Sequence, residues 1–443
     1  MTSRLWIIFP IVALLLGLLA SAFLGRKSQE QEKTKGRNSQ GTIELVYWGV
    51  SEPTDAMQGL ITTYQELHPN VRITYVRQNR EQYLERLRSR FSGGEDTSKP
   101  DIFQWHNTWK PMVTSLLASA PTDVFTETDI RTSFYPVIVK DIVQGSNILG
   151  VPLSLDGLVL LVNEDLFSSL GFKEAPKTWN EFRDVAKALT RKDTSGEMVV
   201  AGAALGTSTN VEHWSDLLGL LILQGGANPE NPQGQAAEDA LVFYTRFAKE
   251  DGVWNDRMDP SLVAFANGRV AMAFSPVWRI PEIIRTNPQL KFRVTPVPQL
   301  PDAGREGLLP AVSWASYWVE GVAATSPHQE EVWKFLKFAT EPEQLLRLSA
   351  ERTDILGSTL PFPRPDLAQS ATGDQVAIAF TQQAPFLDSF PMAYGTKDNG
   401  LNDAVIAVYD EAVRAIYRGI SPASVLETVR QQLPGILFQY GAK

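Results

Sequence analysis

The chain has 443 residues, of which 43% are hydrophobic, and its 28 prolines are spread along its length. A chain of this size and composition is typical of a folded protein with more than one lobe. The formal net charge is −9 and the body contains no basic cluster, so nucleic acid is excluded as an expected partner. Cysteine is absent from the sequence, which excludes a disulfide framework and a lipid attached to cysteine.

The amino-terminal segment is strongly apolar. Leu5–Leu24 follows a single positive residue, Arg4, and its length of about 20 residues is enough to span a bilayer. Ala20-Ser21-Ala22 offers a small-residue site of the kind that signal peptidase reads. Residues 1–25 are therefore predicted to be either a cleaved signal peptide or an uncleaved membrane anchor. The charged residues that flank the segment do not decide its orientation in the membrane. Residues 26–41 lack large apolar side chains and are predicted to be a flexible linker.

The body begins with alternating strand and helix patterns. Consecutive strands joined by helices pair in parallel, so this order predicts a doubly wound parallel sheet. The predicted segments, in chain order, are the strand Ile43–Trp48, the helix Asp55–Leu67, the strand Val71–Val76, the helix Arg80–Phe91 and the strand Asp101–Trp105.

Aromatic and polar residues lie where two of these strands end. Trp48 ends the first strand, Trp105 ends the third, and Asn107 follows closely. Ligands of open α/β sheets gather at the carboxyl ends of the strands, so these residues are candidates for ligand contact, with core packing as the alternative. The chain has only four histidines, none in a metal-ligand pair, and neither a metal site nor a cofactor is expected.

A carboxylate interrupts two apolar runs in the middle of the chain. Val151–Leu155 and Leu158–Asn163 both read as strand, and the second is an unbroken apolar run of the kind found in the centre of a covered sheet. Asp156 lies between them and must reach water or find a partner, because burying a lone carboxylate is costly. Two interpretations stay open here: a turn at a sheet edge, or a chain that crosses between lobes with Asp156 facing the cleft.

Two further tryptophans precede or follow predicted elements. Trp214 is near the start of an apolar helix that Gly225-Gly226 ends, and it could face either a cleft or a core. The short strand Val270–Phe274 leads to Trp278 and Arg279, which places an aromatic ring and a hydrogen-bond donor beyond a strand end. We therefore include Trp214, Trp278 and Arg279 among the candidates for ligand contact.

A succession of motifs resembles a known family. The motifs are VYWGVSEP, PDIFQW, GVPLSLDGLVLLVNEDLF, PKTWNEF, FANGRVAMAFSPVW and SPHQEEVWKFLKFATEPE. Each is a weak pattern alone, but their order resembles that of the family 1 extracellular solute-binding proteins, the maltose-binding-protein-like receptors of ABC importers. The resemblance covers nearly all of residues 42–440.

The resemblance implies an α/β, two-lobed periplasmic-binding-protein fold of the type II kind, with crossing hinge segments and a ligand cleft between the lobes. Lobe I is expected to comprise residues 42–154 with 299–352, and lobe II residues 155–298 with 353–443. In this family the counterpart of GVPLSLDG crosses between the lobes, which favours the hinge interpretation of Asp156.

The resemblance also implies ligand-binding residues. Trp48, Trp105, Trp278 and Tyr394 match positions where family members often place stacking aromatics, and Glu52, in the loop after the first strand, is added as a polar contact. The sequence departs from the family at SWASYW, near the second hinge, where the relatives have a glycine-rich segment. Trp314 and Tyr317 in this segment line a different pocket or fill a core.

The expected function is that of an exported, monomeric receptor, periplasmic or extracellular, that captures a neutral sugar or related polyhydroxyl solute and delivers it to the permease subunits of an ABC importer. An anchored sensor of the same fold is the alternative, since it differs only in its membrane partner. A carbohydrate-active enzyme is disfavoured, because no acidic pair stands out by its spacing and no catalytic residue is assigned.

Overall fold

The computed structural model describes residues 41–93, 99–305, 307–370 and 374–442. The predicted signal or anchor segment, and all but the last residue of the predicted linker, lie outside these described residues. Across the described ranges, no helix combines the length and the apolar character that a membrane crossing requires.

The chain divides into two units. The smaller comprises residues 1–44 and 65–72, and the larger comprises residues 45–64 and 73–443. In the described part of the smaller unit, the Ile43 amide donates to the Asn70 carbonyl at 2.8 Å and the Val71 amide to the His68 carbonyl at 2.9 Å. The larger unit contains most of both main sheets and all of the cavity described below.

The first sheet has the strand order β2-β1-β3-β13-β4. β1 and β3 run parallel, as the alternation of strands and helices predicts, but β13 joins β3 in the antiparallel direction. The sheet is therefore mixed rather than purely parallel, because a strand from much later in the chain is inserted into it. Its strands are β1 (Ile43–Gly49), β2 (Val71–Arg77), β3 (Ile102–His106), β4 (Leu117–Ala118) and β13 (Trp318–Ala323).

The second sheet has the order β11-β7-β10-β9-β8. β7 (Leu158–Asn163) pairs antiparallel with both of its neighbours, and all six of its residues are buried. The prediction that this apolar run lies inside a covered sheet is confirmed. The other strands are β8 (Arg191–Lys192), β9 (Met198–Ala203), β10 (Val270–Pro276) and β11 (Phe292–Thr295).

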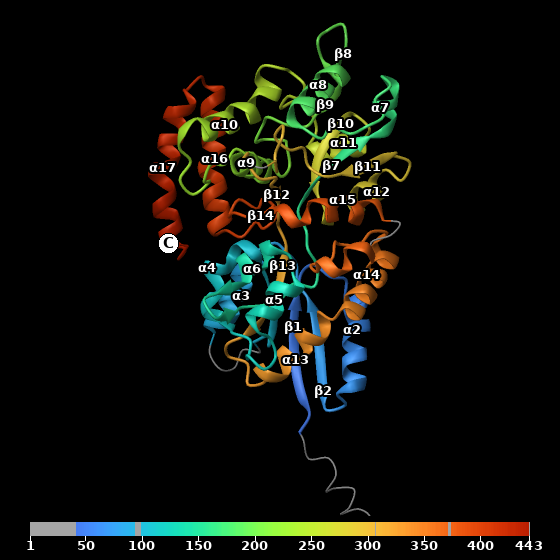
Figure 1. Cartoon of the computed structure of the whole chain (residues 1–443), viewed down its shortest axis with the longest axis vertical. Coiled ribbons are helices and arrows are strands. Elements are labelled where there is room, and N and C mark those ends of the chain that lie inside the picture. The colour runs from blue at the N-terminus through green and yellow to red at the C-terminus, as the bar shows by residue number, and fades with distance from the viewer. Residues whose placement is uncertain (1–40, 94–98, 306, 371–373, 443) are drawn as a thin grey trace, which may run out of the picture. The chain divides into compact units, whose positions relative to one another are not determined.

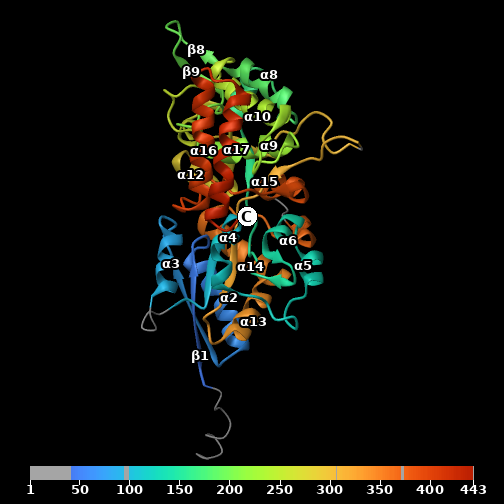
Figure 2. The same ribbon diagram turned by 90° about the vertical axis from the view of Figure 1, so that its left-hand side faces the viewer.

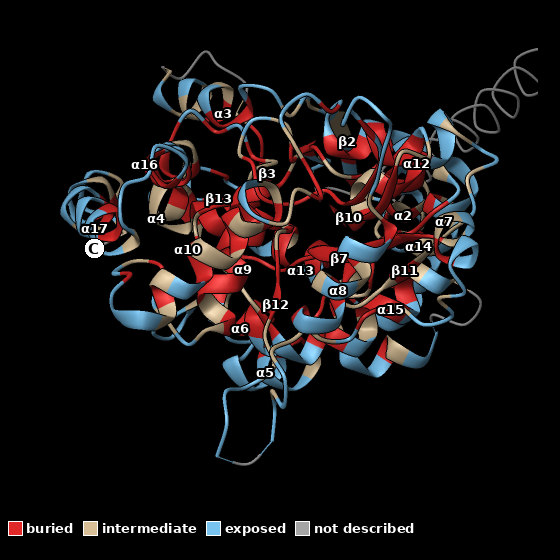
Figure 3. Cartoon of the chain, turned by 90° about the horizontal axis from the view of Figure 1, so that it is seen from above, coloured by how far each residue is buried: buried red, intermediate tan, exposed pale blue. Residues whose placement is uncertain are grey.

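Helices surround both sheets, and buried residues gather along β3, β13, β7 and β10 (Figure 3). Helices α10, α16 and α17 pack on one another beside the second sheet (Figures 1 and 2). The helices are α2 (Thr54–Leu67), α3 (Tyr83–Ser92), α4 (Lys110–Val113), α5 (Glu127–Ser133), α6 (Pro136–Ile142), α7 (Glu164–Ser169), α8 (Trp179–Leu189), α9 (Trp214–Gln224), α10 (Gly234–Lys249), α11 (Ser261–Ala266), α12 (Ile280–Thr286), α13 (Gln329–Ala339), α14 (Pro342–Leu356), α15 (Gln375–Gln383), α16 (Leu401–Tyr417) and α17 (Pro422–Gln439).

The chain crosses from the first sheet to the second through residues 150–157, which we call the crossing segment. Val151 bridges to Glu320 in β13 of the first sheet, and β7 of the second sheet begins immediately after Gly157. A Cβ on Gly157 would lie 1.9 Å from the Trp314 carbonyl oxygen, so only glycine fits this close passage. The stretch therefore crosses between the two sheets rather than turning at a sheet edge, and the fold is α/β with two lobes.

Two other segments accompany the crossing. The Ser316 amide donates to the Asp156 carbonyl at 2.9 Å, and the Leu155 amide donates to the Pro361 carbonyl at 2.8 Å. Nearby, the short strands β12 (Ser313–Trp314) and β14 (Leu387–Asp388) pair in parallel. Segments that are far apart in the sequence therefore meet where the chain passes between the sheets.

Candidate functional site

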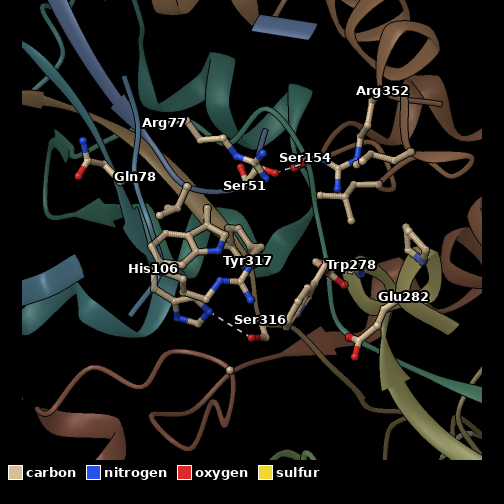
Figure 4. Close-up of a pocket in the computed structure, with 18 of the residues that line it drawn as sticks. Ser51, Arg77, Gln78, His106, Ser154, Trp278, Glu282, Ser316, Tyr317 and Arg352 are labelled. Carbon is tan, nitrogen blue, oxygen red and sulfur yellow. Dashed lines mark hydrogen bonds between the residues drawn. The ribbon is translucent and has the colours of Figure 1, made fainter. Parts of the chain in front are cut away.

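A cavity of about 620 Å³ lies between the ends of the two sheets, within the larger unit. Its walls come from the loops that follow β1 and β2, from the crossing segment, from the start of β13, and from helices α12 and α14 (Figure 4). The lining combines two tryptophan rings, hydroxyls, amides and charged groups. This mixture of apolar ring surface and directed polar groups is typical of a small-molecule site.

Trp278 presents the cavity with an aromatic ring from the second sheet. It lies in a single 3-10 turn, Val277–Arg279, that directly follows β10, and its side chain is partly exposed. The Arg80 guanidinium carbon lies 3.9 Å from the centroid of the Trp278 ring and 5.9 Å from that of Trp318. The cation therefore lies near two indole rings, an arrangement that ring quadrupoles favour.

Asp156 holds the turn that carries Trp278. Its carboxylate accepts hydrogen bonds from the backbone amides of Gly157 at 2.6 Å, Val277 at 2.8 Å and Trp278 at 3.2 Å. The side chain is only 4% exposed, and burial raises the pKa of Asp156 to about 7, although the three amides oppose this rise. Asp156 lines the cavity as predicted, and its observed partners are backbone donors of this chain.

His106 and Ser316 add a neutral polar pair to the wall. His106 Nε2 lies 3.1 Å from Ser316 Oγ (Figure 4). His106 Nδ1 lies 2.8 Å from the Thr108 hydroxyl. Burial lowers the pKa of His106 to about 3, and the charge of Arg80 adds to this effect. The imidazole is therefore neutral at physiological pH and serves as a hydrogen-bonding group rather than as a cation.

Glu52 acts on the cavity through an arginine. It is 1% exposed and forms an ion pair of 2.5 Å with Arg352, which does line the cavity. Glu52 was expected to contact the ligand directly, but the structure places its carboxylate behind the wall. Its role in this arrangement is to neutralise and orient the Arg352 guanidinium.

Trp48 and Trp105 do not line this cavity. Trp105 is 0% exposed, and its indole lies against the backbone at Gly150 and Gly321. Trp48 faces α3, with the Arg90 guanidinium carbon 5.5 Å from its ring centroid. Each residue lies one position before the end of its strand, close to where it was predicted, but its side chain points into a packing layer, because successive residues of a strand face opposite sides of the sheet.

Trp214 and Trp314 are also buried. The Trp314 indole is 0% exposed, donates to Asp216 Oδ1 at 2.9 Å and packs on α9 at Gly219. Trp214, at the start of α9, is 3% exposed. Of the alternatives left open by the sequence, the structure shows the core position for both.

Asn107 belongs to a different hollow. Its amide group donates to Asp141 Oδ2 at 2.8 Å, and the Tyr317 hydroxyl donates to the same oxygen at 3.0 Å. Asn107 lines a second cavity of about 550 Å³ beside α4, whereas Tyr317 lines the first one. The expected contact of Asn107 with the ligand of the main cavity is therefore absent from this structure.

Arg279 and Tyr394 lie beside the main cavity. Arg279 forms ion pairs with Glu212 and with Glu282, the latter at 2.9 Å, and Glu282 lines the cavity. Tyr394 is partly exposed, its ring centroid lies 5.2 Å from that of His213, and the neighbouring Gly395 lines the cavity. Neither side chain is among the residues that line the cavity.

Several lining residues were missed from the sequence, above all arginines. The fold brings together Arg77 from the end of β2, Arg80 from the loop after it, Arg285 from α12 and Arg352 from α14. No local motif marks them, because they come from parts of the chain that are far apart in the sequence. Trp318 was missed for the same reason. In the part of the chain that the structure describes, no group of three His, Asp or Glu side chains is placed to hold a metal ion.

Comparisons with known proteins identify relatives that are described as sugar-binding proteins. The chain is 21% identical to the diacetylchitobiose-binding protein of Streptomyces coelicolor over 289 residues, which cover 62% of this chain and 65% of that relative's length. It is 20% identical to the maltotriose-binding protein of Pyrococcus abyssi over 328 residues, covering 70% and 66% of the two chains.

Solved structures share the fold. The cyclic α-maltosyl-1,6-maltose-binding protein of Arthrobacter globiformis matches with a TM-score of 0.72 at 18% identity, covering 90% of this chain and 100% of that one. A cyclo/maltodextrin-binding protein in complex with maltotetraose matches with a TM-score of 0.69 at 16% identity, covering 90% and 99%. The family model described as bacterial extracellular solute-binding protein matches residues 50–345, which is more than half of the sequence. The chain therefore belongs to the family of bacterial extracellular solute-binding proteins.

Proposed function

We propose that this protein captures a carbohydrate or related polyhydroxyl solute outside the cytoplasm and delivers it to the permease subunits of an ABC importer. The observation that carries the proposal is the partly exposed Trp278 ring in the wall of a cavity between two sheets. An indole face suits the CH-rich face of a sugar ring, while hydroxyls, amides and guanidinium groups of the same wall suit sugar hydroxyls. The relatives named above bind oligosaccharides, which supports this substrate class.

Closure of two lobes on the solute is the proposed mechanism. Residues 42–154 with 299–352 would form lobe I, and residues 155–298 with 353–443 would form lobe II. The crossing segment links the two sheets, and a hinge needs only a few residues that absorb the change in backbone angles. A solute shifts the open–closed equilibrium through its different affinity for the two forms, so only the closed, liganded form would dock productively on a permease.

The membrane attachment is part of the proposal. Residues 5–24 would either tether the protein to the cytoplasmic membrane or be removed after Ala22. A relative from Streptomyces antibioticus is described as a lipoprotein, which supports a location outside the cytoplasm. Amino-terminal sequencing of the mature protein separates the tethered from the released form. A cytosolic product with an intact start would contradict both.

A thermal-shift panel of mono- and oligosaccharides, sugar alcohols, amino acids and peptides tests the substrate class. A solute at about 100 times its dissociation constant should stabilise the protein by roughly 2.7 kcal/mol. Stabilisation by amino acids or peptides, with none by any carbohydrate, would contradict the proposal. Chromatography after prolonged incubation should return the bound solute unchanged, and a new product would indicate an enzyme instead.

A further inference from the structure

The main cavity is rich in positive charge. Its lining contains four arginines but only two carboxylates, those of Asp156 and Glu282. The protein as a whole has a formal charge of −9, so this excess is a local property of the site rather than of the composition. The arginines are Arg77, Arg80, Arg285 and Arg352.

The existing ion pairs do not neutralise this charge. Glu52 pairs with Arg352, and Glu282 pairs with Arg279, which lies beside the cavity. Asp156 is occupied by three backbone amides, as described above.

The other three arginines lack such partners. Within the described ranges, neither an ion pair nor a side-chain hydrogen bond to protein is found for Arg77, Arg80 or Arg285. Arg77 and Arg285 are exposed at the wall, so water can satisfy their donors. Arg80 is different, because it is partly buried within the cavity.

Arg80 is positioned to receive an oxyanion. Trp278 lies 3.9 Å from its guanidinium carbon and Trp318 lies 5.9 Å away. Contact with a ring face leaves the N–H donors at the edge of the guanidinium plane available. Burial lowers the pKa of Arg80 to about 10, which still leaves it charged at neutral pH. The guanidinium lies in the cavity wall and makes no hydrogen bond to protein in the described ranges, so its N–H donors are free to bind a solute. A planar fork of N–H groups matches the two oxygens of a carboxylate or phosphate.

We propose that the solute is an acidic polyhydroxyl compound, whose carboxylate or phosphate is held by Arg80 with help from Arg77 and Arg285. This inference rests on the proposed function, since the polyhydroxyl part stacks on Trp278 as described there. It replaces the expectation of a neutral sugar. A sugar acid and a sugar phosphate share the required oxyanion, and the experiment distinguishes them.

Matched ligand sets test the charge. Calorimetry on the folded protein compares each neutral sugar with its uronate and with its 6-phosphate, at low and at high salt, with inorganic phosphate alone as a further ligand. A charged member should bind at least about tenfold more tightly than its neutral parent, the range expected for a hydrogen bond to a charged group. The advantage should shrink as salt is added. The uronate and phosphate arms identify which oxyanion fits.

Two variants and a control locate the contact. Arg80→Gln and Arg285→Gln should each reduce the affinity ratio of charged to neutral ligand, with the larger loss for Arg80→Gln. The control is Arg131→Gln, because the Arg131 side chain is 59% exposed, pairs with Glu127 on its own helix and does not line the cavity. It should leave the ratio unchanged. Arg285 is exposed, so its variant tests the proposal even where Arg80→Gln fails to fold.

The outcomes separate this inference from the proposed function. A neutral sugar that binds as tightly as its acidic counterparts overturns the acidic solute and leaves a sugar receptor standing. Inorganic phosphate that binds as tightly as the sugar phosphate overturns recognition of a polyhydroxyl part. A panel in which no carbohydrate binds, charged or neutral, overturns the proposed function and this inference together.

Discussion

The carboxylate of Asp156 and the backbone amide of Val277 are 2.8 Å apart and join the crossing segment to the turn beyond β10. The two residues are separated by 121 positions in the sequence. The same carboxylate also accepts the amide of Trp278, so one buried side chain connects the chain that passes between the lobes to the indole that lines the cavity. The position of this ring therefore depends on a group in the crossing segment.

Removing this carboxylate should loosen the turn. Asp156→Ala leaves the amides of Gly157, Val277 and Trp278 without their acceptor, and each unsatisfied buried donor costs about 1–3 kcal/mol. We expect the free energy of unfolding to fall by about 2–5 kcal/mol. The smaller loss is expected if water enters the site and accepts hydrogen bonds from the three amides. Urea unfolding measures this loss. Asp165→Ala, at a side chain that is 69% exposed, is the control and should change little. Equal stability of the two variants would contradict the role of Asp156.

Glu320 should make stability depend on pH. It is 1% exposed, and burial raises its pKa from 4.5 to about 8, with the nearby Glu52 adding to the rise and donors from Gln104 and Tyr47 opposing it. Between these pH values the unfolded chain has released the proton while the folded protein retains it. The folded state then binds more protons, so the free energy of unfolding falls as pH rises, by up to about 1.4 kcal/mol per pH unit.

The variant Glu320→Gln isolates this effect, because it resembles the protonated acid and does not titrate. Urea unfolding of both proteins between pH 5 and pH 8 should show the wild type losing stability relative to the variant as pH increases. Above the folded pKa the difference should become constant. A difference that stays the same across this range would show that Glu320 ionises normally, and a difference that moves the other way would contradict the raised pKa.

The crossing segment should not tolerate a side chain at Gly157. A Cβ there would lie 1.9 Å from a backbone oxygen of Trp314, which cannot move without distorting β12. We expect Gly157→Ala to destabilise the protein by several kcal/mol or to prevent folding. Gly435→Ala is the matched control, because a Cβ there meets nothing within 4 Å and the residue lies in α17. It should stabilise by about 0.5–1 kcal/mol. Similar melting temperatures for the two variants would contradict the close passage.

Local patterns in the sequence predicted local structure well. Thr178 and Glu181 have the spacing typical of a capping box, and the structure forms it, with Trp179 packed in the core beside it. The apolar run at β7 and the strand that leads to Trp278 are confirmed, because burial and alternation are encoded within a few residues. The family resemblance supplied the two-lobed arrangement, which local patterns alone left open.

The cavity wall was predicted only in part, because side-chain direction and long-range pairing decide it. Trp105 lies one residue before the end of β3, close to the strand end that the sequence suggested, yet its ring faces the core. The insertion of β13 beside β3 brings Trp318 to the cavity, and no pattern near either strand encodes that pairing. Arg80 was read only as the start of a helix, whereas α3 begins at Tyr83 and Arg80 stays in the loop.

The contrast between Trp278 and Trp105 tests the site most directly. Trp278 is partly exposed in the cavity wall, so Trp278→Ala should remove a contact worth about 2 kcal/mol and weaken solute binding by roughly thirtyfold, with little change in the melting temperature of the free protein. Trp105 is fully buried, so Trp105→Ala should lower the free energy of unfolding by about 3–5 kcal/mol.

Solution scattering of the wild type and of these two variants, with and without solute, tests whether the Trp278 contact drives lobe closure. The wild type should show a smaller radius of gyration once solute is bound, because the solute favours the closed form. The Trp278→Ala protein should reach the same compact state only at a much higher solute concentration, since the energy that drives closure comes from contacts such as this ring. Trp105→Ala, where it remains folded, should close at nearly the wild-type concentration, because its side chain does not reach the cavity. If Trp278→Ala instead binds solute normally and melts earlier, Trp278 is a packing residue, and the solute must be held by other parts of the wall.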